Sequence, residues 1–143
     1  MSSRKIEDLV PAMQLRAFRF AGAMAEAGIP FMLTSTYRSQ DEQDALWRIG
    51  RSEPGRKVTW TKTSRHTGRT AFDIAILKHG KPTWDTKVDV DADSVPDYLE
   101  AGQIGEAIGL VWGGRFKDGN GKPTPDYCHF ELATGEKEAT CVK

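Results

Sequence analysis

Residues 64–74 of the chain read Ser64-Arg65-His66-Thr67-Gly68-Arg69-Thr70-Ala71-Phe72-Asp73-Ile74. A histidine lies in a glycine-containing bend, and an aspartate follows at the head of an apolar run. Far downstream the chain reads Asp126-Tyr127-Cys128-His129-Phe130-Glu131-Leu132. Two imidazoles and one carboxylate can bind a zinc ion and leave its fourth position open for water. We therefore predict that the fold brings His66, Asp73 and His129 together around one metal ion.

The apolar run predicts a β-strand over residues 71–77, because its side chains alternate between two faces. One face carries Phe72, Ile74 and Ile76, and the other carries Asp73 between two alanines, which leaves room beside the carboxylate. Aspartate is disfavoured in strands, so Asp73 is expected to have a partner. The alternative to a metal is a buried salt bridge with Arg65 or Arg69.

A second strand is predicted over residues 127–132, where His129 shares a face with Tyr127 and Glu131. If this strand pairs with residues 71–77, His129 can face Asp73, and the bend before Asp73 lets His66 fold back over both. Cys128 falls on the opposite face and is expected to be a small buried hydrophobic residue rather than a ligand. His79, between Lys78 and Gly80, is expected to be a solvated turn histidine.

Asp126 precedes His129 by three residues, and Pro125 lets the backbone bend there. Its carboxylate can therefore approach the water without binding the metal, which suits a general base that later returns the proton to a leaving amine. The alternative is that Asp126 only caps a turn.

Arg38 follows a predicted strand over residues 31–36. At the end of that strand it could neutralise an oxyanion or hold a substrate carboxylate. The alternative is an ordinary ion pair with Asp41 or Glu42.

The chain has 143 residues, of which 38% are hydrophobic and 28% charged, as expected for one globular domain. We predict a single domain over residues 1–143, with a core from about 4 to 133 and a frayed tail over 134–143. Lys plus Arg equals Asp plus Glu, 20 each, so no general affinity for nucleic acid or anionic membrane is implied. A monomer is expected.

The N-terminus lacks the apolar segment of a signal peptide, and no apolar run approaches the about 18 residues that cross a membrane. Synthesis in the cytoplasm without a signal peptide is therefore expected. The two cysteines, Cys128 and Cys141, form no C-x-x-C pair and no disulfide framework.

Hydrophobic periodicity and capping signals predict the remaining elements. A helix is expected over residues 9–27, with Pro11 in its first turn and Asp8 as its cap. A second helix starts after Ser39, whose capping box is completed by Glu42, and runs to about Ile49. Further elements are a short strand at 58–60, a hairpin turn at 79–82, an acidic segment at 85–95, a helix at about 96–108 capped by Asp93 or Ser94, and a strand at 110–112.

Three blocks of the sequence resemble the VanY-like family of D-alanyl-D-alanine carboxypeptidases and L-alanyl-D-glutamate endopeptidases. The blocks, which span roughly residues 31–132 in the family order, are Ser35-Thr36-Tyr37-Arg38-Ser39 with Glu42, Gln43 and Leu46; Ser64-x-His66-x-Gly68-x-x-Ala71-x-Asp73-Ile74; and Trp112-Gly113-Gly114 with Asp126-x-x-His129-Phe130-Glu131-Leu132. The resemblance implies one Zn²⁺ held by His66, Asp73 and His129. It also implies that Asp126 is the catalytic carboxylate and that Arg38 contacts substrate or transition state.

The fold that the resemblance implies is a small α+β domain, in which an antiparallel sheet has helices packed on one side, as in hedgehog and lysostaphin-type zinc peptidases. The substrate that it implies is a peptidoglycan stem peptide. Asp-x-x-His, where the D-Ala-D-Ala enzymes usually have Glu-x-Trp-His, resembles the phage endolysins that cut L-Ala-D-Glu. The missing signal peptide agrees with a lysin released to the wall through a holin pore.

Two other functions stay open. One is a D-alanyl-D-alanine carboxypeptidase or dipeptidase, and the other is a non-catalytic zinc-binding domain that binds a peptide or protein partner. Trp60 lies in the loop before the metal motif and is a candidate for substrate contact. The basic residues of that loop are either a solvated face or an attractant for stem-peptide carboxylates; they are Arg51, Arg56, Lys57, Lys62 and Arg65.

Overall fold

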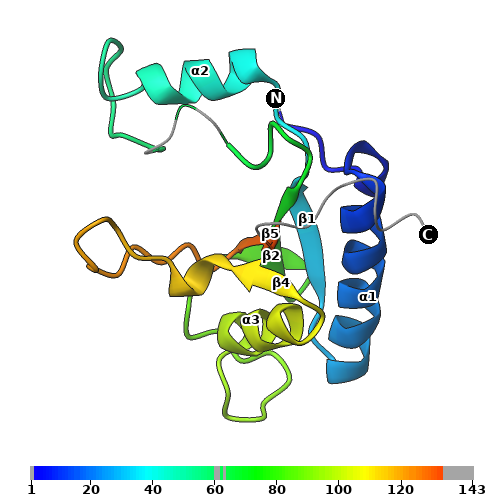
Figure 1. Ribbon diagram of the computed structural model, residues 1–143. Helices are drawn as coiled ribbons and strands as arrows, with labels where there is room; N and C mark the ends of the chain where they lie inside the picture. Colours follow the sequence, from blue (N-terminus) through cyan, green and yellow to red (C-terminus); the bar gives the residue numbers. More distant parts are fainter. Residues whose placement is uncertain (1, 60–61, 63, 134–143) are drawn as a thin grey trace.

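A computed structural model describes residues 2–59, 62 and 64–133. Its centre is an antiparallel sheet in the order β1-β2-β5-β4 (Figure 1). The short strand β3 pairs with the C-terminal end of β2. The strands are β1 (Phe31–Ser35), β2 (Ala71–Lys78), β3 (Lys81–Thr83), β4 (Leu110–Trp112) and β5 (His129–Leu132). The helices are α1 (Pro11–Ala27), α2 (Gln40–Arg48) and α3 (Asp97–Ala107), with short 3-10 turns η1 (Ile6–Asp8) and η2 (Gly113–Arg115). This architecture confirms the expected fold class.

The core lies between one face of β2 and β5 and the helices α1 and α3. The alternation predicted for β2 is present, because Phe72, Ile74 and Ile76 are fully buried. The ring of Phe72 stacks on Phe130 of β5, and Phe20 of α1 packs against both. Asp73 is consequently directed to the opposite face, where the two strands can present polar groups.

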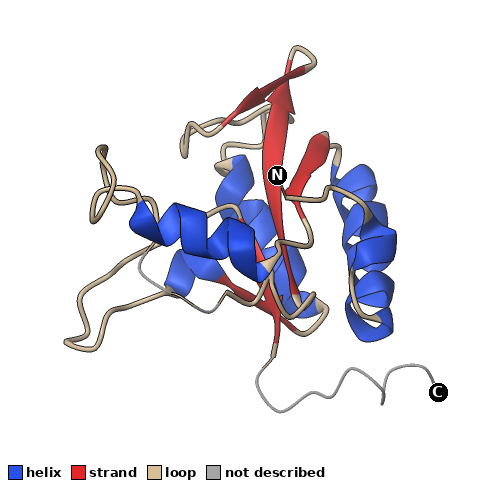
Figure 2. Cartoon of the chain, turned by 90° about the horizontal axis from the view of Figure 1, so that it is seen from above, coloured by secondary structure: helices blue, strands red, loops and turns tan. Residues whose placement is uncertain are grey.

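Helix α1 follows the sheet along one side, whereas α2 lies beyond the end where β1 finishes (Figure 1). Seen from above, α1 lies to the right of the strands and α2 extends to the left (Figure 2). Pro11 is the first residue of α1 as predicted, but the residue before the helix is Val10 rather than Asp8. The Asp8 carboxylate instead accepts a hydrogen bond from the Ser3 hydroxyl.

The capping box of α2 is present as predicted. The Ser39 hydroxyl accepts from the Glu42 amide, and the Glu42 carboxylate accepts from the Ser39 amide, both at 3.1 Å. These two bonds fix the start of α2, and Arg38 lies in the short segment between β1 and that start.

Some predictions about element ends and loops need correction, and others fall outside the described residues. Val58 and Thr59 are in a loop rather than a strand, and Trp60 lies outside the described residues, as does the tail over 134–143. Helix α3 starts after Pro96 without a side-chain cap, so neither Asp93 nor Ser94 caps it. The last strand begins at His129 and not at residue 127, because the residues before it form a turn.

Candidate metal centre

Asp73 of β2 and His129 of β5 are directly paired in the sheet, as the alternation of the two strands predicted. Oδ1 of Asp73 lies 3.0 Å from Nδ1 of His129, and Oδ2 lies 3.2 Å from Nε2 of His66. One ligand atom from each of the three residues lies within 4.8 Å of the other two, which is close enough for all three to contact one metal ion. The structure therefore brings together the three residues that the sequence singled out.

His66 is held in the bend between Ser64 and Thr70 by one bond within the bend and by two bonds to the segment that follows β1. Its backbone carbonyl accepts from the Arg38 amide at 3.3 Å and from the Arg69 amide at 3.1 Å. Its Nδ1 lies 3.1 Å from the carbonyl oxygen of Thr36, which can only accept a hydrogen bond. Nδ1 therefore carries a proton, which leaves Nε2, the ring nitrogen that faces Asp73, as the one available to a metal ion.

His129 has the same arrangement with the two nitrogens exchanged. Its Nδ1 faces Asp73, and its Nε2 lies 2.9 Å from Oε1 of Glu131, two residues along the same strand face. Oε2 of Glu131 in turn lies 3.7 Å from Nε of Arg65. The sequence reasoning placed Glu131 on the face of His129 but gave it no role, although the two-residue spacing is the signal that identifies it.

The salt bridge considered for Asp73 is absent among the described residues, because both candidate arginines contact other groups. Arg65 faces Glu131 and donates to the Leu132 carbonyl at 2.8 Å. Arg69 donates to the Asp8 carbonyl and lies over the Tyr37 ring. The two imidazoles are the groups that compensate the Asp73 carboxylate.

Electrostatics keep the Asp73 carboxylate in its ionised form. Burial alone would raise the pKa of Asp73, but the hydrogen bonds and charges of His129 and His66 hold it well below its usual range. Burial would lower the pKa of His129, yet its contacts with Asp73 and Glu131 raise it to about 9. The carboxylate therefore stays ionised, and it makes with the two imidazoles a donor set that suits zinc, whose binding displaces the protons they share with Asp73.

Asp126 lies in a tight turn that leads directly into β5. Its carbonyl accepts from the His129 amide at 3.2 Å, and its amide donates to the Gly113 carbonyl at 2.8 Å. These two backbone bonds close the turn. The Cys128 thiol donates to Oδ1 of Asp126 at 3.2 Å, so the thiol is directed to the carboxylate rather than to the three candidate ligands.

Gly113 and Trp112 support the turn of Asp126 from behind. A Cβ at Gly113 would lie 2.4 Å from the Asp126 carbonyl oxygen and 3.0 Å from Cβ of His129, so only glycine fits there. Nε1 of Trp112 donates to the Tyr127 carbonyl at 2.9 Å, and the indole ring is packed so closely against Gly102 and Gly114 that neither has room for a Cβ. These contacts give a physical reason for the block Trp112-Gly113-Gly114.

Arg38 lies at the end of β1 as predicted, beside the candidate metal site. Its Nη1 donates to Oε1 of Gln43 at 2.9 Å and its Nε to the Ser2 hydroxyl at 3.1 Å, so neither Asp41 nor Glu42 is the partner given by these contacts. Gln43 is fully buried in α2 and also donates to Thr59. The sequence reasoning did not identify Gln43 as the residue that orients the guanidinium.

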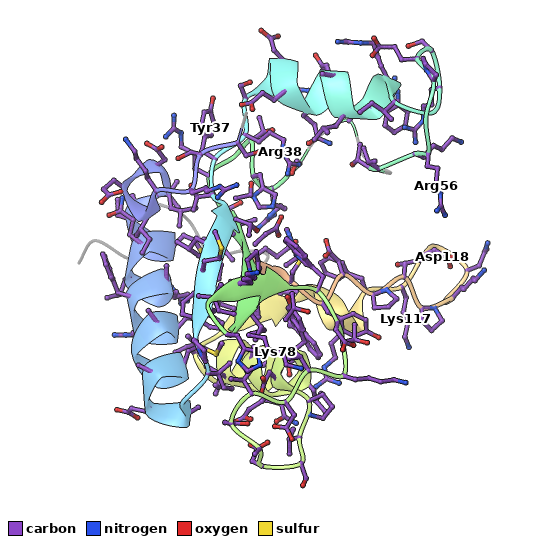
Figure 3. The ribbon with its side chains drawn as sticks, turned by 180° about the vertical axis from the view of Figure 1, so that it is seen from behind. Tyr37, Arg38, Arg56, Lys78, Lys117 and Asp118 are labelled. Carbon is purple, nitrogen blue, oxygen red and sulfur yellow. The ribbon has the colours of Figure 1, made fainter. Side chains whose placement is uncertain are left out.

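The predicted residues share one cleft with a volume of about 930 Å³. His66, Asp73 and His129 line it together with Arg38 and Asp126. One side is formed by α2 and the loop after it, and the other by the segment from Phe116 to Asp126. Figure 3 shows Arg56 and Lys117 on these two segments, with Arg38 nearer to the end of β1.

Two of the basic residues in the loop after α2 contact other residues of the protein. Arg51 lies 3.4 Å from the centre of the Trp47 ring and donates to the carbonyls of Trp47 and Thr59, and Lys62 lies over the same ring. His79 is exposed in the turn between β2 and β3, as predicted.

Solved structures with the same fold include two that are described as follows. The L-Ala D-Glu endopeptidase ChiX of Serratia marcescens has a TM-score of 0.62 at 21% identity, over 93% of this chain and 89% of ChiX. VanYB in complex with D-Alanine-D-Alanine has a TM-score of 0.56 at 14% identity, over 87% of this chain and 71% of VanYB. The chain therefore has the fold that ChiX and VanYB share.

Sequence comparison then gives the family. The profile described as D-alanyl-D-alanine carboxypeptidase matches residues 57–132. The chain is also 36% identical over 131 residues to the peptidoglycan L-alanyl-D-glutamate endopeptidase CwlK of Bacillus subtilis (strain 168), which covers 87% of this chain and 74% of CwlK. The chain belongs to the D-alanyl-D-alanine carboxypeptidase family of VanY-like metallopeptidases, and so it is a hydrolase, as the resemblance implied.

None of the helices in the part of the chain that the structure describes combines the length and the apolar character that a membrane crossing requires.

Proposed function

We propose that this protein is a zinc-dependent endopeptidase that hydrolyses the L-Ala-D-Glu bond of peptidoglycan stem peptides. The observation that carries the proposal is the cleft in which His66, Asp73 and His129 converge beside Asp126 and Arg38. The 36% identity with CwlK, whose name gives that bond, supports the choice of substrate.

The three candidate ligands have the orientation and chemistry that zinc requires. His66 presents Nε2 because Thr36 fixes its proton on Nδ1, and His129 presents Nδ1 because Glu131 contacts its Nε2. Two imidazoles and one carboxylate leave a coordination position for water, as catalytic zinc sites do. When bound there, zinc polarises a carbonyl and lowers the pKa of its water to about 7.

The residues of the chain perform the proton transfers. Asp126 accepts the proton of the attacking water and then donates it to the nitrogen of the leaving D-Glu residue. Arg38, held by Gln43 and Ser2, donates hydrogen bonds to the oxygen of the scissile carbonyl as negative charge develops on it. Asp126 suits this role because its turn is closed by the backbone, which leaves the carboxylate at the cleft.

The test is digestion of purified muropeptides with the zinc-loaded protein, followed by mass spectrometry. Fragments with a new N-terminal D-Glu are expected, and a chelator should abolish them until zinc is restored. A preparation that binds zinc but cleaves no stem peptide would support the non-catalytic zinc-binding domain instead.

A second candidate is a D-alanyl-D-alanine carboxypeptidase or dipeptidase, which the description of the family profile favours. The same digestion separates the two, because this activity releases free D-Ala. Asp126-x-x-His129, which resembles the phage endolysins in having aspartate at this position, favours the first candidate.

A role as a phage endolysin in host lysis is part of the proposal and rests on that resemblance. Protein added to Gram-negative cells should then cause lysis only after the outer membrane has been permeabilised. Intact cells treated in parallel provide the control.

A further inference from the structure

The stretch that leads from the loop after β3 into the first turn of α3 contains five acidic residues within twelve positions. Residues 89–100 read Asp89-Val90-Asp91-Ala92-Asp93-Ser94-Val95-Pro96-Asp97-Tyr98-Leu99-Glu100. Counted from Asp89, the carboxylates occupy positions 1, 3, 5, 9 and 12. In the twelve-residue calcium loop of EF-hand proteins, these are the positions whose side chains face the ion, and position 12 is a glutamate.

The structure brings these carboxylates together in space. Ligand oxygens of Asp89, Asp91 and Asp97 lie within 4.8 Å of one another, and those of Asp91, Asp93 and Glu100 form a second such group. Asp91 belongs to both groups and therefore joins the five carboxylates into one cluster. Five carboxylates at this separation repel one another unless a cation lies between them.

Buried oxygens without a partner point to a cation ligand independently of the sequence pattern. Asp97 is fully buried, and while its Oδ2 accepts from the Val90 amide at 2.6 Å, its Oδ1 has no hydrogen-bond partner. Oδ1 of Asp91 and Oε1 of Glu100 are likewise buried and unpaired. A buried carboxylate oxygen without a partner costs free energy, so three in one cluster need an explanation.

The backbone of the segment has the shape that such a loop requires. Ser94, at position 6, has φ of 70°, the left-handed conformation for which EF-hand loops use glycine. The Asp89 carboxylate accepts from the amides of Asp93 and Ser94, which curls the loop around the first ligand. Helix α3 begins at Asp97, so Glu100 projects from its first turn.

We propose that residues 89–100 form a calcium site, separate from the His66–Asp73–His129 centre, with Asp89, Asp91, Asp93, Asp97 and Glu100 as side-chain ligands. The donors are all hard oxygens, which favour Ca²⁺ over zinc. Calcium also accepts six to eight ligands in irregular geometry, whereas Mg²⁺ demands a near-ideal octahedron.

Calcium bound at this site would connect the loop to helix α3, which packs behind the turn that contains Asp126. Asp97 and Glu100 lie in the first turn of α3, and Gly102 follows in contact with the Trp112 ring. Trp112 in turn donates to the Tyr127 carbonyl, next to Asp126. Calcium is therefore expected to stabilise the fold on the side of the molecule that positions Asp126.

Equilibrium dialysis of the zinc-loaded protein against calcium tests the proposal directly. The buffer contains fixed zinc and no other divalent cation, and both metals are counted in each sample. We expect one calcium per chain, unchanged zinc content, and an affinity for Mg²⁺ at least tenfold weaker. Wild-type protein that binds no calcium at millimolar concentration would overturn the proposal whatever its peptidase activity.

Variants test whether the named residues are the ligands. Glu100→Gln and Asp91→Asn should each weaken calcium binding at least tenfold, while Glu26→Gln, an exposed charge change on α1, should bind like wild type. At calcium 100 times its dissociation constant, the folding equilibrium constant of wild type should rise about 100-fold, seen as a higher unfolding midpoint. Wild-type calcium affinity in both ligand variants would refute the assignment of these residues. If a variant fails to fold, the calcium stoichiometry and the calcium-dependent unfolding midpoint of the wild-type protein decide the question.

Discussion

Asp73 and His129 are direct partners in the β2–β5 ladder, and the carboxylate of one lies 3.0 Å from the imidazole of the other. The two residues come from strands that are 56 residues apart in the sequence. The proposed metal centre therefore forms only when β5 has paired with β2. Because binding to the folded state alone stabilises it, zinc removal should lower the unfolding midpoint as well as the activity.

Asp126→Ala is expected to abolish peptide hydrolysis while zinc remains bound. The variant removes the proposed general base, a role that typically contributes 100-fold to 10,000-fold to the rate. The measurement is the rate of muropeptide cleavage together with zinc content per chain. Purified variant that still digests permeabilised cell walls at the wild-type rate would exclude Asp126 as the base.

Glu131→Gln should weaken zinc binding because it removes the carboxylate that contacts Nε2 of His129. Groups that hold a metal-binding histidine in this way typically contribute 10-fold to 100-fold in affinity or activity. Competition with a chromophoric chelator measures the change. Glu106→Gln is a matched control, since Glu106 pairs with Arg115 on the surface of α3 and should leave the affinity unchanged.

Gly113→Ala should disturb the turn that carries Asp126. The new Cβ would lie 2.4 Å from the Asp126 carbonyl, and overpacking of this kind costs about 1–3 kcal/mol of stability. We expect a lower free energy of unfolding by urea denaturation and a loss of activity larger than the loss of zinc. Gly119→Ala is the control in the same segment, because no atom lies within 4 Å of a Cβ at that position.

The acidic residues of the proposed calcium site (residues 89–100) should make the stability of the protein depend on pH when calcium is absent. Burial and neighbouring carboxylates raise the pKa of Asp91 to about 6 and that of Glu100 to about 7; the charged groups that face them are Asp89, Asp93 and Asp97. A carboxyl whose pKa rises on folding contributes stability below its unfolded pKa and loses it as the pH rises through the folded pKa. For Glu100 this loss falls between its ordinary value of 4.5 and about 7.

The variant Glu100→Gln should therefore gain stability relative to wild type as the pH rises from about 5 to 8. Urea denaturation without calcium measures the difference at each pH. Saturating calcium should remove the gain, because the ion favours the ionised carboxylates. A difference between the two proteins that stays constant with pH would show that Glu100 does not titrate as expected, and Glu26→Gln serves as the reference.

Local patterns predicted the parts of the fold that depend on neighbouring residues. The alternation around Asp73 predicted β2 and its two faces, and the capping box at Ser39 predicted the start of α2. Alternation also placed Asp73 and His129 so that they could face each other if the two strands paired, and the structure shows that pairing. These features are set within a few residues, so they can be identified without tertiary information.

The misplaced elements depend on contacts between distant segments. The start of β5 was predicted two residues early, since the turn before it is held by Gly113 and Trp112, which are far away in sequence. Glu131 and Gln43 each orient a site residue through a hydrogen bond that strand or helix patterns do not show. The cap expected at Asp93 or Ser94 is absent because the Asp93 carboxylate accepts from Val95 within the acidic loop.

Arg38→Met is expected to slow hydrolysis with little effect on zinc binding, because the guanidinium lies beside the metal centre and is not one of its ligands. Removal of one donor to a developing oxyanion typically costs 100-fold to 1,000-fold in kcat. Arg38→Lys keeps the charge but not the planar guanidinium that Gln43 and Ser2 hold, so it should restore only part of the rate. Arg56→Met, on the exposed loop after α2, is the control for a loss of general positive charge and should retain kcat. Equal losses of activity in Arg38→Met and Arg56→Met would mean that both residues act only by attracting the substrate. A rise in KM without a change in kcat in Arg38→Met would instead assign Arg38 to a substrate carboxylate and not to the oxyanion.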